Sequence, residues 1–224
     1  MTFSIAARCA QTHMFGVAIA SSSPAVAARC AHARAGVGAV ATQNITDPAL
    51  GPRTLDSLAR ALGADRALEE TLRSTAFGAY RQLVVLGARG PAAVHSGRHA
   101  LGLAASAIGP DSAAAGNLLG HREVPAAMVS AFEAADGHLG ARLLQALRAG
   151  AARGGEAGPI HSAGLLVVRE VSWPIVDLRV DWSDHDPLGA LAAAWEIYAP
   201  QIDDYVRRAL DPGAAPGFGV PGNL

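Results

Sequence analysis

The chain has 224 residues, of which 50% are hydrophobic and 17% charged, enough for one domain with a sizeable core, or a domain with an appendage. Its 18 basic and 19 acidic residues give a net charge of −1 without any basic tract, which argues against nucleic-acid and anionic-membrane binding. Every basic residue is an arginine, so Schiff-base catalysis and lysine dyads are excluded.

Cys9 and Cys30 are the two cysteines of the chain. Without a secretory segment before them they indicate reduced thiols rather than a disulfide framework. No uncharged apolar stretch reaches the length needed to cross a bilayer. We therefore expect a cytoplasmic protein with no membrane association.

The first predicted elements are two strands at 2–9 and 14–21 that form a hairpin. In the first strand apolar and polar side chains alternate, and in the second small residues line one face, so that another layer can approach closely. The two faces of the first strand comprise Phe3 and Ile5 on one side, and Thr2, Ser4 and Arg8 on the other.

The rest of the chain divides into helices and short strands. Residues 25–34 fit a short helix or a loop, residues 44–52 a turn-rich connection, and residues 100–117 form a low-charge stretch without assignment. Glycine and apolar spacing predict the remaining elements: strands at 36–43, 81–87, 92–96, 161–169 and 175–181, helices at 53–62 and 65–76 (with Asp65 as N-cap), a helix pair within 122–153 ending at Gly154–Gly155, and a helix capped by Asp186, kinked at Pro200 and ending near Leu210.

This order places helix pairs between runs of antiparallel strands, which favours packed sheets covered by helices over a Rossmann sheet. We expect one α+β domain over residues 2–210. The Gly- and Pro-rich residues 211–224 predict a tail that is mobile or packs on a neighbouring subunit of a homo-oligomer.

Thr2 follows the initiator methionine, and a small second residue is what methionine removal requires. The mature chain would then begin with a residue that carries both a hydroxyl nucleophile and a free α-amine, which is a recognised base for threonine. The pKa of an unperturbed α-amine is about 7.7–8.0, so part of it is neutral near pH 7. The alternative interpretation is an ordinary N-terminal strand with a processed methionine.

Several short segments occur together in a recognisable order. They are Thr2-Phe3-Ser4-Ile5, Gly-Val-Ala-Ile-Ala-Ser at 16–21, Ala-Gly-Val-Gly-Ala-Val-Ala-Thr-Gln at 35–43, Gly-Pro-Arg at 51–53, Tyr80-Arg81-Gln82, Gly116-Asn117-Leu118-Leu119, Arg-Leu-Leu-Gln-Ala-Leu at 142–147, Ser162-Ala163 and Asp-Leu-Arg-Val-Asp at 177–181. Over residues 2–210 this pattern resembles the bacterial family called domain of unknown function 1028, placed in the N-terminal nucleophile (Ntn) hydrolase superfamily.

The resemblance implies a four-layer αββα sandwich of two antiparallel sheets. It also implies a hydrolase of amide-type bonds in which Thr2 is both nucleophile and base. Family members tend to carry an acidic residue, arginines and a glutamine before the Ser-Ala motif. Here Glu156 is present, the arginines are absent and His161 replaces the glutamine, so we expect a different substrate preference or a loss of activity.

Amide hydrolysis needs donors aimed at the oxyanion, and Asn117 is the best side-chain candidate, with Gly116 allowing close approach to the backbone. Ordinary turn residues are the alternative. Other polar residues at predicted strand positions or strand ends are candidates for binding substrate or orienting the amine, against ordinary surface, turn or edge roles. They are Arg8, Ser21, Ser22, Thr42, Gln43, Arg81 and His161.

The eight histidines provide no convincing metal set, and helix capping better explains the Asp-His-Asp run at 184–186. No Gly-x-Ser-x-Gly elbow occurs. We therefore expect neither metal nor cofactor. Two functions remain: an Ntn amidohydrolase acting on a small amide, cyclic amide or peptide-like metabolite, or a non-catalytic small-molecule-binding protein on the same fold.

Overall fold

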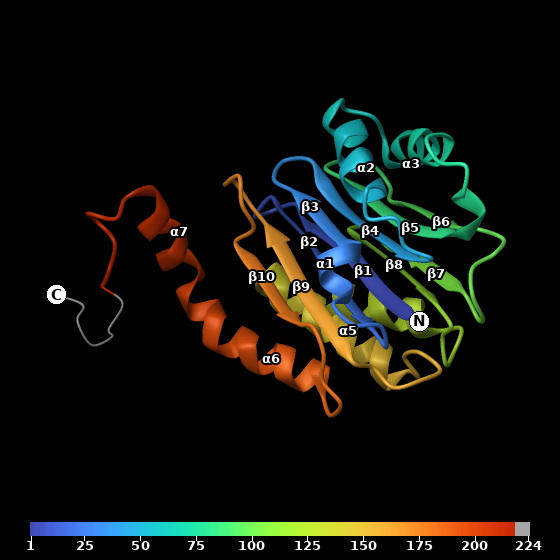
Figure 1. Cartoon of the computed structure of the whole chain (residues 1–224). Helices are drawn as coiled ribbons and strands as arrows, with labels where there is room; N and C mark the ends of the chain where they lie inside the picture. Colours follow the sequence, from blue (N-terminus) through green and yellow to red (C-terminus); the bar gives the residue numbers. More distant parts are fainter. Residues whose placement is uncertain (218–224) are drawn as a thin grey trace.

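In the computed structural model, which describes residues 1–217, two antiparallel sheets pack face to face, with helices on their outer sides (Figure 1). The larger sheet has the strand order β10-β9-β2-β1-β8-β7 and the smaller one β3-β4-β5-β6. The strands are β1 (Thr2–Cys9), β2 (Met14–Ser21), β3 (Ala31–Arg34), β4 (Gly38–Asn44), β5 (Arg81–Gly87), β6 (Ala93–Ser96), β7 (Ala105–Ile108), β8 (Ser112–Asn117), β9 (Ser162–Val168) and β10 (Val176–Val180).

Two helix pairs complete the layers. Helices α2 and α3 cover the small sheet, and α4 and α5 cover the large one. This arrangement confirms the predicted α+β sandwich of two antiparallel sheets. The helices are α1 (Val26–Cys30), α2 (Leu50–Ala59), α3 (Ala64–Arg73), α4 (Val124–Ala134), α5 (Leu139–Ala152), α6 (Pro187–Tyr198) and α7 (Ile202–Leu210).

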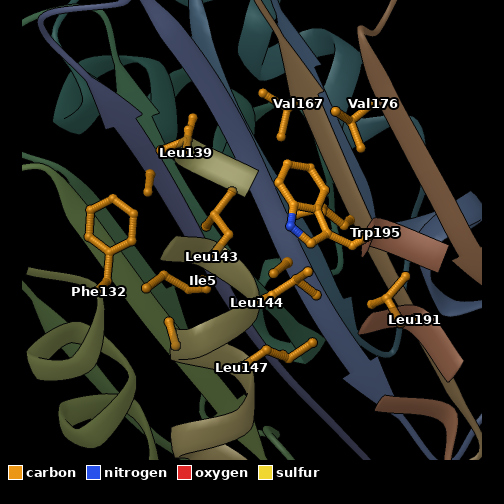
Figure 2. Close-up of a cluster of buried hydrophobic side chains, with 14 of the residues drawn as sticks. Ile5, Phe132, Leu139, Leu143, Leu144, Leu147, Val167, Val176, Leu191 and Trp195 are labelled. Carbon is orange, nitrogen blue, oxygen red and sulfur yellow. The ribbon is translucent and has the colours of Figure 1, made fainter. Parts of the chain in front are cut away.

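The alternation in β1 positions the core. Phe3 and Ile5 are fully buried against α4 and α5, whereas Ala6 packs between the two sheets. The small-residue face of β2 receives α5, because a Cβ on Gly16 would lie only 2.7 Å from Leu143 Cδ1. Figure 2 shows how the leucines of α5 fill this layer, with Trp195 of α6 closing one side.

The structure also differs from the sequence predictions. Residues 25–34 form α1 and β3, and residues 100–117 contain the hairpin of β7 and β8. Helix α2 begins at Leu50, three residues early, because Pro52 fits a first helical turn. Helix α3 is preceded by Gly63 without a side-chain cap, so the prediction of Asp65 as N-cap is wrong; Asp65 lies in the first turn, where its charge suits the helix dipole.

The Asp186 cap and the interruption of the last helix at Pro200 are confirmed. Asp186 caps α6 by accepting a 2.8 Å hydrogen bond from the amide of Gly189, and a short 3-10 turn at Ala199–Gln201, which contains Pro200, separates α6 from α7. In the predicted tail, Pro216 and Gly217 accept hydrogen bonds from Arg208. Residues 218–224 of that tail lie outside the described residues. Within residues 1–217, no helix is long and apolar enough to span a membrane.

Candidate active site

Four polar side chains form a row across the ends of four neighbouring strands of the large sheet. The strand register places Ser162 opposite Ser21, Ser21 opposite Thr2, and Thr2 opposite Asn117. Residues directly opposite one another point to the same face of a sheet. Ser4, two residues after Thr2, donates a 2.6 Å hydrogen bond to Gln43 of the small sheet. The row therefore faces the space between the sheets, and all four of its residues are buried.

A chain of side-chain amides links this row to the small sheet. Gln43 Nε2 donates to the carbonyl of Ala115 (3.2 Å) and to Gln82 Oε1 (2.8 Å), and Gln82 Nε2 donates to the carbonyl of Gly116 (2.9 Å). Because a carbonyl can only accept, these contacts fix which end of each glutamine is the NH₂ group. Gln82 Oε1 therefore faces Asn117 as an acceptor.

Asn117 is oriented by this amide chain. Its Nδ2 donates to Gln82 Oε1 at 3.0 Å, which uses one of its two N–H groups. Its Oδ1 is buried without a hydrogen-bond partner. The next residue, Leu118, has a left-handed φ of 49°, a conformation that is uncommon outside glycine and concentrates at functional sites.

Met1 covers Thr2 in this structure. The Thr2 hydroxyl donates to the carbonyl oxygen of Met1 (2.5 Å) and lies 3.1 Å from Ser21 Oγ, which also donates to Met1. The methionine side chain packs where a Cβ on Gly158 would lie, 2.8 Å from Met1 Cε. The nitrogen of Thr2 is thus an amide until Met1 is removed.

Glu156 is a buried acid beside this N-terminus, and the sequence analysis did not select it. Only 6% of the residue is exposed, and neither carboxylate oxygen has a hydrogen-bond partner. Burial raises the pKa of Glu156 to about 7, although the N-terminal ammonium and Ser22 lower that pKa in part. The signal available was its isolation, because Glu156 is the only acidic residue between Asp136 and Glu170.

Two other predicted residues, Ser22 and His161, lie around the row. Ser22 neighbours Glu156, while Ser21 accepts a hydrogen bond from the amide of Ser23 (3.0 Å) and so shapes the loop after β2. His161 donates its backbone N–H to Ser21 O (2.9 Å), but its ring stacks on Trp182 at 4.2 Å. The imidazole therefore lies at the rim of the site, against the loop before α6.

Arg8 does not reach Thr2, contrary to the sequence expectation. Six residues of strand separate the two, about 20 Å at 3.3 Å per residue. The guanidinium instead pairs with Asp111 at 2.8 Å and donates to the carbonyls of Gly87 and Gly90.

Thr42 and Arg81 also lie outside the row. They neighbour Gln43 and Gln82 along their strands, so their side chains point to the opposite face of the small sheet. Thr42 donates to the carbonyl of Asp47, and Arg81 donates to the carbonyl of Ile45. These residues brace the connection between β4 and α2.

Gly116 serves packing rather than ligand access. A Cβ at this position would lie 2.4 Å from Leu119 Cδ2, so the missing side chain admits Leu119 to the core. In the described part of the chain, no group of three or more His, Cys, Asp or Glu residues is arranged to hold a metal ion.

Comparisons with known proteins agree on one family. The model of a family of unknown function, DUF1028, matches residues 2–191. The crystal structure of protein SPO2555 from Silicibacter pomeroyi, also assigned to DUF1028, is similar at 30% sequence identity and a TM-score of 0.82, covering 91% of this chain and 94% of that one. No curated protein matches the chain. With most of its length matched by the family model and its fold shared with a solved member, the chain belongs to the DUF1028 family.

Proposed function

We propose that the protein is an Ntn-type amidohydrolase that cleaves a small amide, cyclic amide or peptide-like metabolite, with Thr2 as nucleophile after Met1 removal. The observation that carries this proposal is the row of Ser21, Thr2 and Asn117 at the very start of a core strand. A rigid strand holds the hydroxyl in place, and the neighbouring polar groups are already oriented. The proposal includes a cytoplasmic homo-oligomer that acts without metal, cofactor, nucleic acid or membrane.

The chemistry uses the hydroxyl and the α-amine that Thr2 carries once Met1 is removed, together with Asn117. The Thr2 hydroxyl attacks the amide carbonyl while its own α-amine takes the proton, and the second N–H of Asn117 holds the oxyanion. The ammonium then returns that proton to the leaving nitrogen, and the C–N bond breaks to give an ester on Thr2. Water hydrolyses the ester, with the amine again accepting a proton, and frees the enzyme.

The second candidate is a non-catalytic binding protein, which applies if the chain keeps Met1, because Met1 then covers Thr2. If methionine is retained, the amine stays an amide and cannot act as a base. The mass of the purified protein distinguishes the two states directly. Near-complete retention of Met1 would favour the binding protein.

The test of the mechanism screens amides for release of ammonia or an amine and then compares variants. Thr2→Ala should abolish turnover, and Thr2→Ser should keep part of it, because hydroxyl and amine both survive. Insertion of Ala between Met1 and Thr2 should also abolish turnover, because the hydroxyl remains while the free amine moves away. Thr12→Ala, at an exposed turn, is the matched control and should be unchanged. Wild-type turnover by Thr2→Ala or by the insertion variant would refute the mechanism.

A further inference from the structure

The segment that carries Glu156 lies beside the N-terminal end of β1. The amide of Gly120 donates to Gly155 O (3.0 Å) and that of Ala157 to Leu118 O (2.8 Å), which attaches the segment to the residues just after β8. Leu118 follows Asn117, the strand partner of Thr2. Together with the contact between Gly158 and Met1, these bonds place Glu156 at the beginning of β1.

The Glu156 carboxylate lacks a partner in this position. Neither buried oxygen has a partner at hydrogen-bond geometry, although Ser22 lies close enough to lower the pKa of the carboxyl group, and such a position is costly for a charged group. Asp184, His185 and Asp186 line the same cleft of about 370 Å³, but among titratable groups it is the N-terminal ammonium that acts on the pKa of Glu156. The natural partner of the carboxylate is therefore the amine at the start of the chain.

We propose that, once Met1 is removed, Glu156 is the positioning residue that pairs with the α-amine of Thr2. The inference rests on the proposed function, because it assigns a partner to the base of that mechanism. Met1 removal brings the free amine one residue inward, to the nitrogen of Thr2. The carboxylate then accepts a hydrogen bond from this amine and directs its lone pair toward the threonine hydroxyl.

Such a pair helps the reaction through the charge that develops. When the amine takes the hydroxyl proton it becomes an ammonium, and a carboxylate already in place stabilises that cation as it forms. The proton stays on nitrogen and Glu156 remains ionised. The nearby opposite charge also raises the pKa of the amine, typically by about 1–3, so less of the amine is neutral at pH 7 while the neutral fraction that remains is the stronger base.

The experiment titrates the α-amine without any substrate. The sequence contains no lysine, so the N-terminal amine is the sole primary amine of the mature chain. Its reductive methylation by formaldehyde and a borohydride, followed by intact mass across a pH series, reports the pKa of this amine because only the neutral form reacts. Glu156→Gln should lower that pKa by about 1 or more, which speeds labelling near pH 7 about tenfold.

Controls keep the result decisive. Glu196→Gln removes the same charge from an exposed position on α6 and should leave the pKa of the amine unchanged. Glu156→Asp keeps the charge and should retain part of the shift, which covers the case that the glutamine variant does not fold. Equal amine pKa values in wild type, Glu156→Gln and Glu156→Asp would overturn the proposal.

The two proposals fail in different ways. A shifted amine pKa in Glu156→Gln without any amide turnover in the wild type would uphold the pairing and refute the hydrolase. Turnover that depends on Thr2 while the amine pKa ignores Glu156 would uphold the hydrolase and refute the pairing. A variant that binds amine-bearing compounds less well at an unchanged amine pKa would assign Glu156 to the substrate instead.

Discussion

The two ends of β1 carry polar side chains into the same space between the sheets, yet they are built differently. At one end, the guanidinium of Arg8 donates hydrogen bonds to Asp111 and to the carbonyls of Gly87, Gly90 and Pro110. At the other end, Asn117 Oδ1 and both oxygens of Glu156 have no partner.

This difference indicates that the two ends of β1 have different roles, one structural and one functional. Polar groups that are fully hydrogen-bonded rigidify a fold, whereas buried groups left unpaired cost free energy and persist where a ligand or reaction uses them. The Arg8 end therefore holds the two sheets together, and the Thr2 end is the candidate active site. Substitutions at the two ends should affect different measurements.

After Thr2 itself, the largest effect is expected at Asn117. Asn117→Ala removes the proposed oxyanion donor, so turnover of an amide identified by screening should fall about 10²–10³-fold while the melting temperature changes little. Thr12→Ala again serves as the control. Turnover within twofold of wild type would remove Asn117 from the mechanism and transfer the oxyanion to backbone N–H groups.

Arg8→Met should produce the opposite result. It leaves Asp111 and several carbonyls without their donor, and because Asp111 is partly exposed we expect a loss of about 2 kcal/mol in the free energy of unfolding. Turnover per folded molecule should not change. Urea titration measures the first and the amide assay the second, and a stable but inactive Arg8→Met protein would erase the contrast between the two ends.

Glu156 should make the stability of the Met1-bearing chain depend on pH. Its native pKa, about 7, lies above 4.5, the ordinary value for a glutamate, so between these values the folded protein holds a proton that the unfolded chain has released. The free energy of unfolding should therefore fall as the pH rises from about 4.5 to about 7. Glu156→Gln should remove this component and Glu196→Gln should keep it, as measured by urea titration at each pH. If the free energy of unfolding varied with pH in the same way in wild type, Glu156→Gln and Glu196→Gln, the raised pKa of Glu156 would be contradicted.

The smallest effect is expected at Gly116. Gly116→Ala places a methyl group against Leu119, whose side-chain end can shift, so the free energy of unfolding should fall by about 1 kcal/mol. Turnover should stay near wild type, because this position faces the core and not the site. A large loss of turnover without a loss of stability would restore the role in ligand access that the sequence suggested.

The sequence allowed good prediction of elements with a clear hydrophobic pattern. Phe3 and Ile5 alternate with polar residues, so the faces of β1 were correct, and the leucines of α5 marked a helix. The hairpin of β7 and β8 was not predicted, because Ala113, Ala114 and Ala115 are buried on both faces and show no alternation.

The site was predictable only in part. Thr2 stands out through its place in the chain and Asn117 through its amide donor beside Gly116, and the register brings the two opposite each other. Arg8 was expected near Thr2 because both lie on the same face of the first strand. A shared face does not bring them together, since the two ends of the strand are about 20 Å apart. Glu156 and Gln82 were not selected, because a long-range contact with the first residues leaves no local periodicity.

The contact of Met1 with Thr2 and Gly158 gives the start codon a role in the chemistry. Under the proposed mechanism, any residue left before Thr2 covers the nucleophile and keeps its nitrogen an amide. Expression from a start codon placed a few codons upstream would therefore give a protein that folds but has no activity. Affinity tags for this protein therefore belong at the end of the chain that follows α7, and activity reported as absent from N-terminally tagged material would carry no weight against the enzyme.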